Sequence, residues 1–270
     1  MYSLCISITD FYCRLFIDNY QLYSFFKKTF YLHEGVKRPH LNVILKEAEE
    51  TAERIGSNLD SPTFYYSKEN LKKNKFKKII FGAIAYIEYF AQAENIIFLH
   101  ASSLIYNHKG YVFCGPSGIG KTTVINKAAD DQVYSDDFTV IKKVKNGFFI
   151  YPSPFDKIRV NNFLYKKDGG LPVKKIFFLN QSTRIRAEKL KHEEALEKTL
   201  HNNILFQAIL TYRQSKNPAG NMDHFKKIKK ETTRIKLDRM FKLISGLTSK
   251  ISAYDLYLAK NTGILSLLKF

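Results

Sequence analysis

The segment YVFCGPSGIGKTTVINKAA, from Tyr111 to Ala129, decides how the middle of this chain folds. Four apolar residues precede a glycine-rich turn, and a helical pattern follows it. This order predicts a strand, a tight loop and a helix from Lys121 to about Ala129. The central GPSGIGKT fits the phosphate-loop pattern G-x4-G-K-[ST], so we expect the loop to hold a nucleotide phosphate.

The spacing of this loop follows from what a phosphate needs. Glycines let the backbone curl so that successive N–H groups point at phosphate oxygens, at the start of the following helix. Lys121 should reach the β- and γ-phosphates of ATP, and Thr122 should offer its hydroxyl to Mg²⁺. The predicted nucleotide-binding residues are Gly115, Pro116, Ser117, Gly118, Ile119, Gly120, Lys121, Thr122 and Thr123.

Two pairs of aspartates follow the loop. Asp130 and Asp131 end the predicted helix, where short polar residues favour a turn. Asp136 and Asp137 follow the apolar QVYS segment, at the carboxyl end of a strand, and this edge faces the ligand crevice in open α/β sheets. One carboxylate can hold Mg²⁺ there, and the other can accept a proton from an attacking hydroxyl. The alternative is that the second pair only caps a turn.

The remaining sequence predicts an α/β arrangement in two parts. Residues 1–94 form a small α/β region without a chemical motif, and residues 95–270 form the domain that carries the loop. The predicted strands are a pair within Tyr2–Phe16 that is broken at Thr9-Asp10, then Leu41–Leu45, Thr63–Tyr66, Ile96–His100, Ser103–Tyr106, Tyr111–Cys114, Val133–Ser135, Phe138–Ile141, Phe148–Tyr151, Ile158–Val160, Lys175–Leu179 and 251–259. The predicted helices are Gln21–Tyr31, Leu71–Glu94, Lys121–Ala129, 192–203, Met222–Leu247 and Ile264–Lys269.

Composition narrows the class of protein further. Lys and Arg number 43 against 25 Asp and Glu, a net charge of +18 that attracts polyanions and makes nucleic acid a possible partner. The basic clusters Lys68–Lys78 and Lys226–Lys236 look helical and are expected to be solvated helix faces. Three cysteines without metal-ligand spacing suit a reducing cytoplasm. The most apolar run, IIFGAIAYIEYFA, is short and contains Glu88, which favours a buried helix over a membrane span.

Taken together, several of these residues resemble a known family. His100, the strand pair after it, GPSGIGKTT and Ser135-Asp136-Asp137 are similar to the catalytic core of HPr kinase/phosphorylase, and closer still to the HPr-kinase-like serine kinases of bacterial gene clusters, some of them beside peptide-modifying enzymes. YPSPFDKIRV, LPVKKIFFLNQ and AYDLYLAKNTGILSLL resemble family segments more loosely. The resemblance covers residues 95–270. It implies a P-loop core of the HPr-kinase C-terminal, phosphoenolpyruvate-carboxykinase-like type.

The resemblance also implies roles for individual residues. Lys121 would bind phosphate, and Thr122 would bind the metal. Asp136 and Asp137 would supply the base for a serine hydroxyl and a metal contact, the latter being expected of Asp137, and which of them is the base stays open. His100 would lie beside the transferred phosphate. Proteins of this family form oligomers, so a homo-oligomer is expected.

One departure from the family limits what is carried over. HPr kinases have an Arg-Gly-x-Gly stretch with a preceding metal-binding Glu after the aspartate pair. Here no Glu occurs between Asp137 and Glu188, and no such glycine stretch appears. We therefore expect an ATP- and Mg²⁺-dependent kinase that acts on a serine-type hydroxyl of a small protein, peptide or metabolite, and whether it also carries out phosphorolysis stays open. The alternatives are a nucleotide-binding regulator, which would associate with nucleic acid through the +18 charge, and plain ATP hydrolysis.

Overall fold

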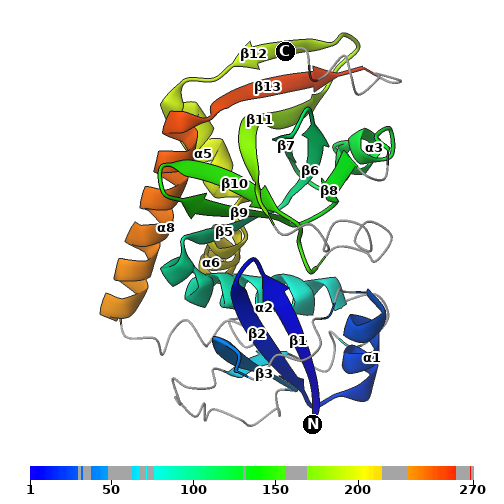
Figure 1. Cartoon of the computed structure of the whole chain (residues 1–270), viewed down its shortest axis with the longest axis vertical. Helices are drawn as coiled ribbons and strands as arrows, with labels where there is room; N and C mark the ends of the chain where they lie inside the picture. Colours follow the sequence, from blue (N-terminus) through cyan, green and yellow to red (C-terminus); the bar gives the residue numbers. More distant parts are fainter. Residues whose placement is uncertain are drawn as a thin grey trace.

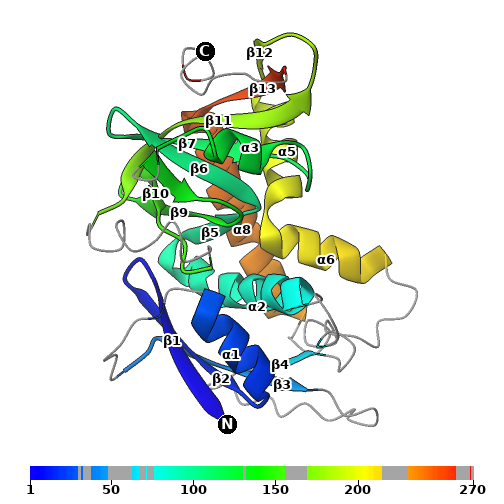
Figure 2. The same ribbon diagram turned by 90° about the vertical axis from the view of Figure 1, so that its right-hand side faces the viewer.

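The computed structural model describes residues 1–29, 32, 38–47, 63–66, 71, 76–129, 132–155, 169–214, 230–259 and 268. These residues form a mixed α/β fold with a four-stranded sheet at one end and a larger, curled sheet at the other (Figure 1). A helix lies between the two sheets, as the view turned by 90° also shows (Figure 2). In the described part of the chain, no helix is both long and apolar enough to cross a membrane.

The smaller sheet contains the N-terminal residues in the strand order β1-β2-β3-β4. The first two strands form an antiparallel hairpin around Thr9-Asp10, and β2, β3 and β4 run parallel to one another. Buried and half-buried residues alternate along β2, which is typical of a sheet with one face on the core. The elements of this region are β1 (Tyr2–Ile8), β2 (Phe11–Ile17), α1 (Tyr20–Thr29), β3 (Leu41–Glu47) and β4 (Thr63–Tyr66).

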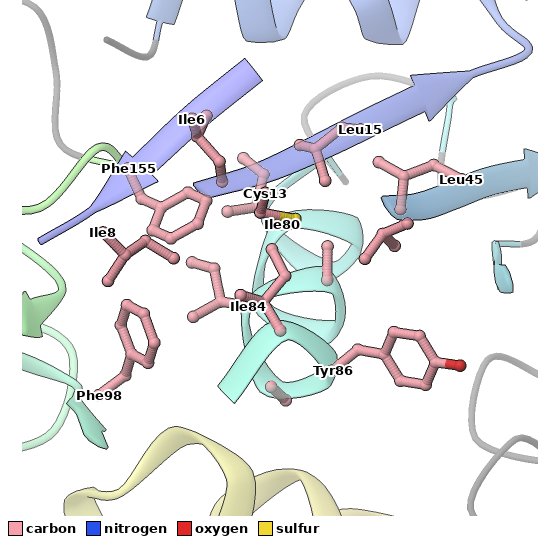
Figure 3. Close-up of a cluster of buried hydrophobic side chains, with 14 of the residues drawn as sticks. Ile6, Ile8, Cys13, Leu15, Leu45, Ile80, Ile84, Tyr86, Phe98 and Phe155 are labelled. Atoms are coloured by element: carbon pink, nitrogen blue, oxygen red, sulfur yellow. The ribbon is translucent and has the colours of Figure 1, made fainter. Parts of the chain in front are cut away.

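Helix α2 (Phe76–Ala91) joins the two sheets into one core. Its apolar residues belong to a cluster that also contains residues of the N-terminal sheet, of β5 (Ile96–Leu99) and of α6 (Ile204–Gln214). In Figure 3, Ile84 of α2 shares this cluster with Ile8 of β1 and Phe98 of β5. A helix that is apolar on nearly every side is expected to be buried, and α2 confirms that expectation. An ion pair between Asp10 and Lys142 of β9 adds a polar link between the sheets.

The larger sheet has the strand order β5-β9-β10-β11-β7-β6-β8, with β13 beside β11 and β12 beside β13. Strand β11 is parallel to both β7 and β13, and the other pairs are antiparallel. Because β5 and β6 stand near opposite ends of this order and only His100 separates them, the sheet has to curl. Its other strands are β6 (Ala101–Tyr106), β7 (Lys109–Cys114), β8 (Val133–Ser135), β9 (Thr139–Val144), β10 (Gly147–Tyr151), β11 (Leu171–Gln181), β12 (Arg186–Lys189) and β13 (Ser252–Leu258).

Helices cover one face of the curled sheet. A second apolar cluster places Ala195 of α5 and Leu243 of α8 against strand residues such as Phe178. Helix α5 begins with a capping interaction in which the Glu194 carboxylate accepts the N–H of Lys191 at 3.0 Å. The helices of this region are η2 (Gln92–Glu94), α3 (Lys121–Ile125), α5 (His192–Asn202), α6 (Ile204–Gln214) and α8 (Lys230–Lys250).

The structure confirms the predicted α/β class and corrects several details. Helix α3 ends at Ile125, not near Ala129, because the N–H groups of Lys127 and Ala128 bond to carbonyls three residues back, which tightens the chain into turns. Helix α6 and strand β12 were not predicted as separate elements. The predicted strand Ile158–Val160, the start of the helix predicted from Met222 and nearly all of the last predicted helix lie outside the described residues. The boundary near residue 94 stays a prediction.

Candidate functional site

The glycine loop lies between the end of β7 and the start of α3. Strand β7 is flanked by β6 and by the parallel strand β11, so the loop leaves the sheet at the carboxyl end of an interior strand. Gly118 and Gly120 have φ angles of 84° and 120°, which side chains of L-residues rarely adopt. A Cβ at either position would meet nothing within 4 Å, so backbone conformation alone requires glycine there. This is the backbone curl that a phosphate-binding loop needs.

Lys121 is buried within this loop. Its ammonium group donates to the carbonyl oxygens of Gly115 at 2.5 Å and of Pro116 at 3.1 Å, so the charge lies against the first residues of the loop. Burial lowers the pKa of Lys121, and the negative charges of Asp137 and Asp136 act in the opposite direction. The loop lysine and the two aspartates therefore belong to one electrostatic cluster.

Several strand ends meet at Ala101, and this junction fixes the aspartate turn. Ala101 opens β6 opposite Cys114, the last residue of β7. Its carbonyl oxygen accepts hydrogen bonds from the hydroxyls of Ser135 at 3.3 Å and Thr139 at 2.9 Å, which flank the turn that contains Asp136 and Asp137. These bonds hold the end of β8 and the start of β9 against the start of β6.

A further hydrogen bond sets the first aspartate of that turn. The hydroxyl of Ser102 donates to the main-chain carbonyl oxygen of Asp136 at 2.6 Å. Ser102 and Ser135 are both fully buried, so these bonds are shielded from water and contribute to a rigid turn. The sequence reasoning did not single out Ser102, because a serine within an apolar strand carries no signal of its own.

His100 faces the second aspartate. The distance from its Nε2 to Oδ1 of Asp137 is 4.0 Å, within ion-pair range when the imidazole is protonated. The His100 side chain is 23% exposed and that of Asp137 is 41% exposed, so both can be reached from solvent. The imidazole also lies nearly parallel to the ring of Phe138, with centroids 6.3 Å apart, which limits its rotation.

Cys114 takes no chemical part in this cluster. It is fully buried, and burial raises the pKa of its thiol to about 12, so it stays protonated near neutral pH. It belongs to the apolar cluster that also contains residues of α5 and α8, which is the setting of a core residue.

The donor set suits Mg²⁺ better than a structural metal. Among the described residues, no group of three or more His, Cys, Asp and Glu side chains could hold a metal ion. The available donors are the hydroxyl of Thr122, which is exposed, and the carboxylate of Asp137. Magnesium bound with a nucleotide usually takes one or two carboxylates, phosphate oxygens and water, so this small set of hard oxygen donors fits it.

The structure brings the four predicted catalytic residues together. His100, Lys121, Asp136 and Asp137 converge where β5, β6, β7 and β8 meet, and their roles in chemistry stay predictions. Asp130 and Asp131, the pair expected to end the loop helix in a turn, lie outside the described residues. Asn202, which accepts the N–H of His100, and Asn203, which bonds to the strand before it, were not predicted to lie near the site.

Comparisons with known proteins place this arrangement in a family. One solved structure that is similar to the chain is the Hpr(Ser) kinase/phosphatase from Coxiella burnetii, at 18% sequence identity and a TM-score of 0.24, covering 34% of this chain and 77% of that chain. No curated protein matches the chain. The family model described as SynChlorMet cassette protein ScmC matches residues 69–261, which include α2, the glycine loop, the aspartate turn and the covering helices. The chain belongs to the ScmC family of SynChlorMet cassette proteins.

Proposed function

We propose that this protein is an ATP-dependent kinase that transfers the γ-phosphate to a serine-type hydroxyl of a small protein, peptide or metabolite. The observation that carries the proposal is the distance of 4.0 Å between Nε2 of His100 and Oδ1 of Asp137, beside the loop that contains Lys121. Two carboxylates and an imidazole beside the loop are groups that a transfer to a hydroxyl would use, as base and as metal ligand. Phosphoryl transfer requires mainly positioning and charge neutralisation, which this group of residues can supply.

The loop would bind the triphosphate through its main-chain N–H groups, from Gly115 to Thr123. Lys121 would exchange its bonds with the Gly115 and Pro116 carbonyls for bonds with phosphate oxygens. Thr122 and Asp137 would hold Mg²⁺, which when bound neutralises phosphate charge. The small number of protein donors is compatible with this role, because the nucleotide and water would complete the coordination.

The transfer itself needs a base close to the acceptor hydroxyl. Asp136 or Asp137 would accept the hydroxyl proton while the serine oxygen forms a bond to the γ-phosphorus. The bond from that phosphorus to the β-γ bridging oxygen breaks, and ADP leaves with the electron pair. His100, in contact with Asp137, would keep that carboxylate in place and lie beside the transferred group.

The net charge of +18 supports a second candidate, a nucleotide-binding regulator that associates with nucleic acid. This candidate requires an affinity for nucleic acid that falls steeply as salt rises, because bound lysines and arginines release counterions. A filter-binding titration with duplex DNA and with RNA at low and moderate salt tests it, and absence of binding at low salt would dispose of it.

The kinase is tested with γ-labelled ATP, Mg²⁺ and an extract of the host cells. Label transferred to a protein, peptide or metabolite by the wild type and by Lys109→Ala, and not by Lys121→Ala, supports the proposal. Lys109 is the control, since it is an exposed lysine at the start of β7, the strand that leads into the loop. Equal transfer by the Lys121→Ala protein and by Asp136→Asn/Asp137→Asn protein would refute the proposal. Label released only as free phosphate would indicate ATP hydrolysis instead.

A further inference from the structure

Glu88 is a fully buried carboxylate in α2 that bonds to two other elements. It accepts hydrogen bonds from the main-chain N–H groups of Phe98 at 3.0 Å and Leu205 at 2.9 Å. It also accepts one from the side-chain amide of Asn203 at 2.5 Å. No ion pair with Glu88 occurs among the described residues, so three N–H donors balance the cost of its burial.

Asn203 completes the connection. Its amide nitrogen donates to the carbonyl oxygen of Phe98 at 3.1 Å as well as to Glu88. Its amide oxygen accepts the N–H of Phe206 at 2.9 Å, which makes it the N-cap of α6. Phe98 is therefore held at both its N–H and its C=O, by two side chains from different helical segments.

The residue held in this way stands just before the candidate site. Phe98 lies two positions before His100, and the N–H of His100 donates to the carbonyl oxygen of Asn202 at 2.8 Å. An isolated bridge also pairs Leu99 with Asn203. All three consecutive residues, 98, 99 and 100, are thus bonded to the joint between α5 and α6.

A purely structural function of Glu88 would not need this arrangement. Packing α2 on β5 needs only apolar side chains, and the cluster around Ile84 already supplies them. A buried charge is rarely the most stable choice for such a contact. What it adds is direction, because it fixes the main-chain N–H of Phe98 in β5 and also the amide of Asn203, which in turn holds the carbonyl oxygen of Phe98.

We propose that Glu88 and Asn203 form a positioning element that holds His100 at its distance from Asp137, so that they set the rate of phosphoryl transfer without touching the nucleotide. The effect on the transfer rate rests on the proposed kinase function, whereas the effect on the position of His100 does not. A shift of about 1 Å in a group of a catalytic site can lower the rate about a hundredfold. His100 lies 4.0 Å from Asp137, so a small displacement of β5 would part the two side chains.

The test uses three variants of the full chain. Glu88→Gln keeps the shape and removes the second acceptor oxygen, and Asn203→Ser keeps a helix cap while removing the bonds to Glu88 and Phe98. Thr199→Val is the matched control, since Thr199 is buried one turn earlier and its hydroxyl donates to the carbonyl oxygen of Ala195 within α5. If Glu88→Gln fails to fold, Asn203→Ser carries the test.

Two readouts are measured on each variant. The first is the NMR spectrum of the ring protons of the seven histidines at one fixed pH, with the His100 signal assigned from a His100→Gln protein. The second is the rate of phosphate transfer at varied ATP concentration. In both test variants we expect a shifted His100 signal, a kcat lower by about tenfold and a KM for ATP within about twofold of the wild type. Thr199→Val should change neither readout.

Unchanged His100 signals in folded Glu88→Gln and Asn203→Ser proteins would overturn the proposal. An equal change in Thr199→Val would overturn it too, since it would show a general response to lost stability. A wild type that transfers no phosphate would end the kinase proposal alone, because the NMR readout tests the positioning of His100 without nucleotide.

Discussion

Glu88 also makes the stability of the protein depend on pH. Burial raises the pKa of this carboxyl from 4.5 to about 7, although three hydrogen bonds to the carboxylate act in the opposite direction. Because the pKa is higher in the folded state than in the unfolded state, the folded state binds the proton more tightly. The contribution to stability is therefore complete below about pH 4.5, falls as pH rises and is lost above about pH 7.

The size of this effect follows from the shift. At about 1.36 kcal/mol per pKa unit, the whole change amounts to roughly 3 kcal/mol. About 2 kcal/mol of it falls between about pH 5 and about pH 7.5. Other groups titrate over the same range, so the comparison has to be made against Glu88→Gln, which has no proton to exchange at this position.

Urea unfolding at these two pH values measures the effect. The drop in the free energy of unfolding from about pH 5 to about pH 7.5 should be about 2 kcal/mol larger for the wild type than for Glu88→Gln. The m-value should be the same in both proteins, because the surface exposed on unfolding does not change. Equal pH dependence in the two proteins would show that Glu88 titrates normally and that its burial is not as described.

Three further predictions follow from the core, the loop and the surface. Ile84→Ala, at a fully buried position of α2, should lower the free energy of unfolding by about 2 to 4 kcal/mol in urea titrations. A loss under about 1 kcal/mol would mean that α2 is not buried on both sides. Gly120→Ala should lower the affinity for a fluorescent ATP analogue. The φ angle of 120° at Gly120 strains any residue with a Cβ by about 1 to 3 kcal/mol, which would distort the loop. Unaltered affinity would contradict the loop conformation. Asp10→Asn should lower the free energy of unfolding by no more than about 1 kcal/mol, because Asp10 is 74% exposed in its pair with Lys142, and added salt should remove the effect. A larger loss that does not depend on salt would contradict a surface ion pair.

Strands and hairpins whose apolar pattern lies within a few consecutive residues could be predicted from the sequence. The hairpin around Thr9-Asp10 follows from alternating apolar residues, and strands β4 and β8 were predicted with the bounds that the structure has. Strand β12 was missed because most of its residues are exposed, so RAEK carries no apolar pattern. Helix α6 was missed, since its residues lie between the predicted helix 192–203 and the one predicted from Met222.

The candidate site divides in the same way. The spacing of GPSGIGKT predicts the loop, and the positions of His100 and the Asp136-Asp137 pair along the chain indicate that these residues lie beside it. The sequence shows Glu88 only as a charge that interrupts an apolar run. Its partners on α6 are more than a hundred residues away, separated by 115 positions for Asn203 and 117 for Leu205. A contact at that distance along the chain depends on tertiary packing and leaves no periodic pattern.

The parallel pairing of β7, β11 and β13 has a consequence for how the protein is synthesised. The hairpin of β6 and β7 is complete early, but Cys114 gains its partner Phe178 only when β11 arrives, and Phe178 pairs with Asp255 near the end of the chain. Contacts so distant in sequence form slowly, because the intervening chain has to be closed into large loops. A nascent chain that stops before β13 leaves the edge of β11 unpaired, and such an edge recruits other chains. Strand β13 is therefore the point in translation from which the glycine loop has its finished scaffold, and chains arrested before it are expected to aggregate or to need a chaperone.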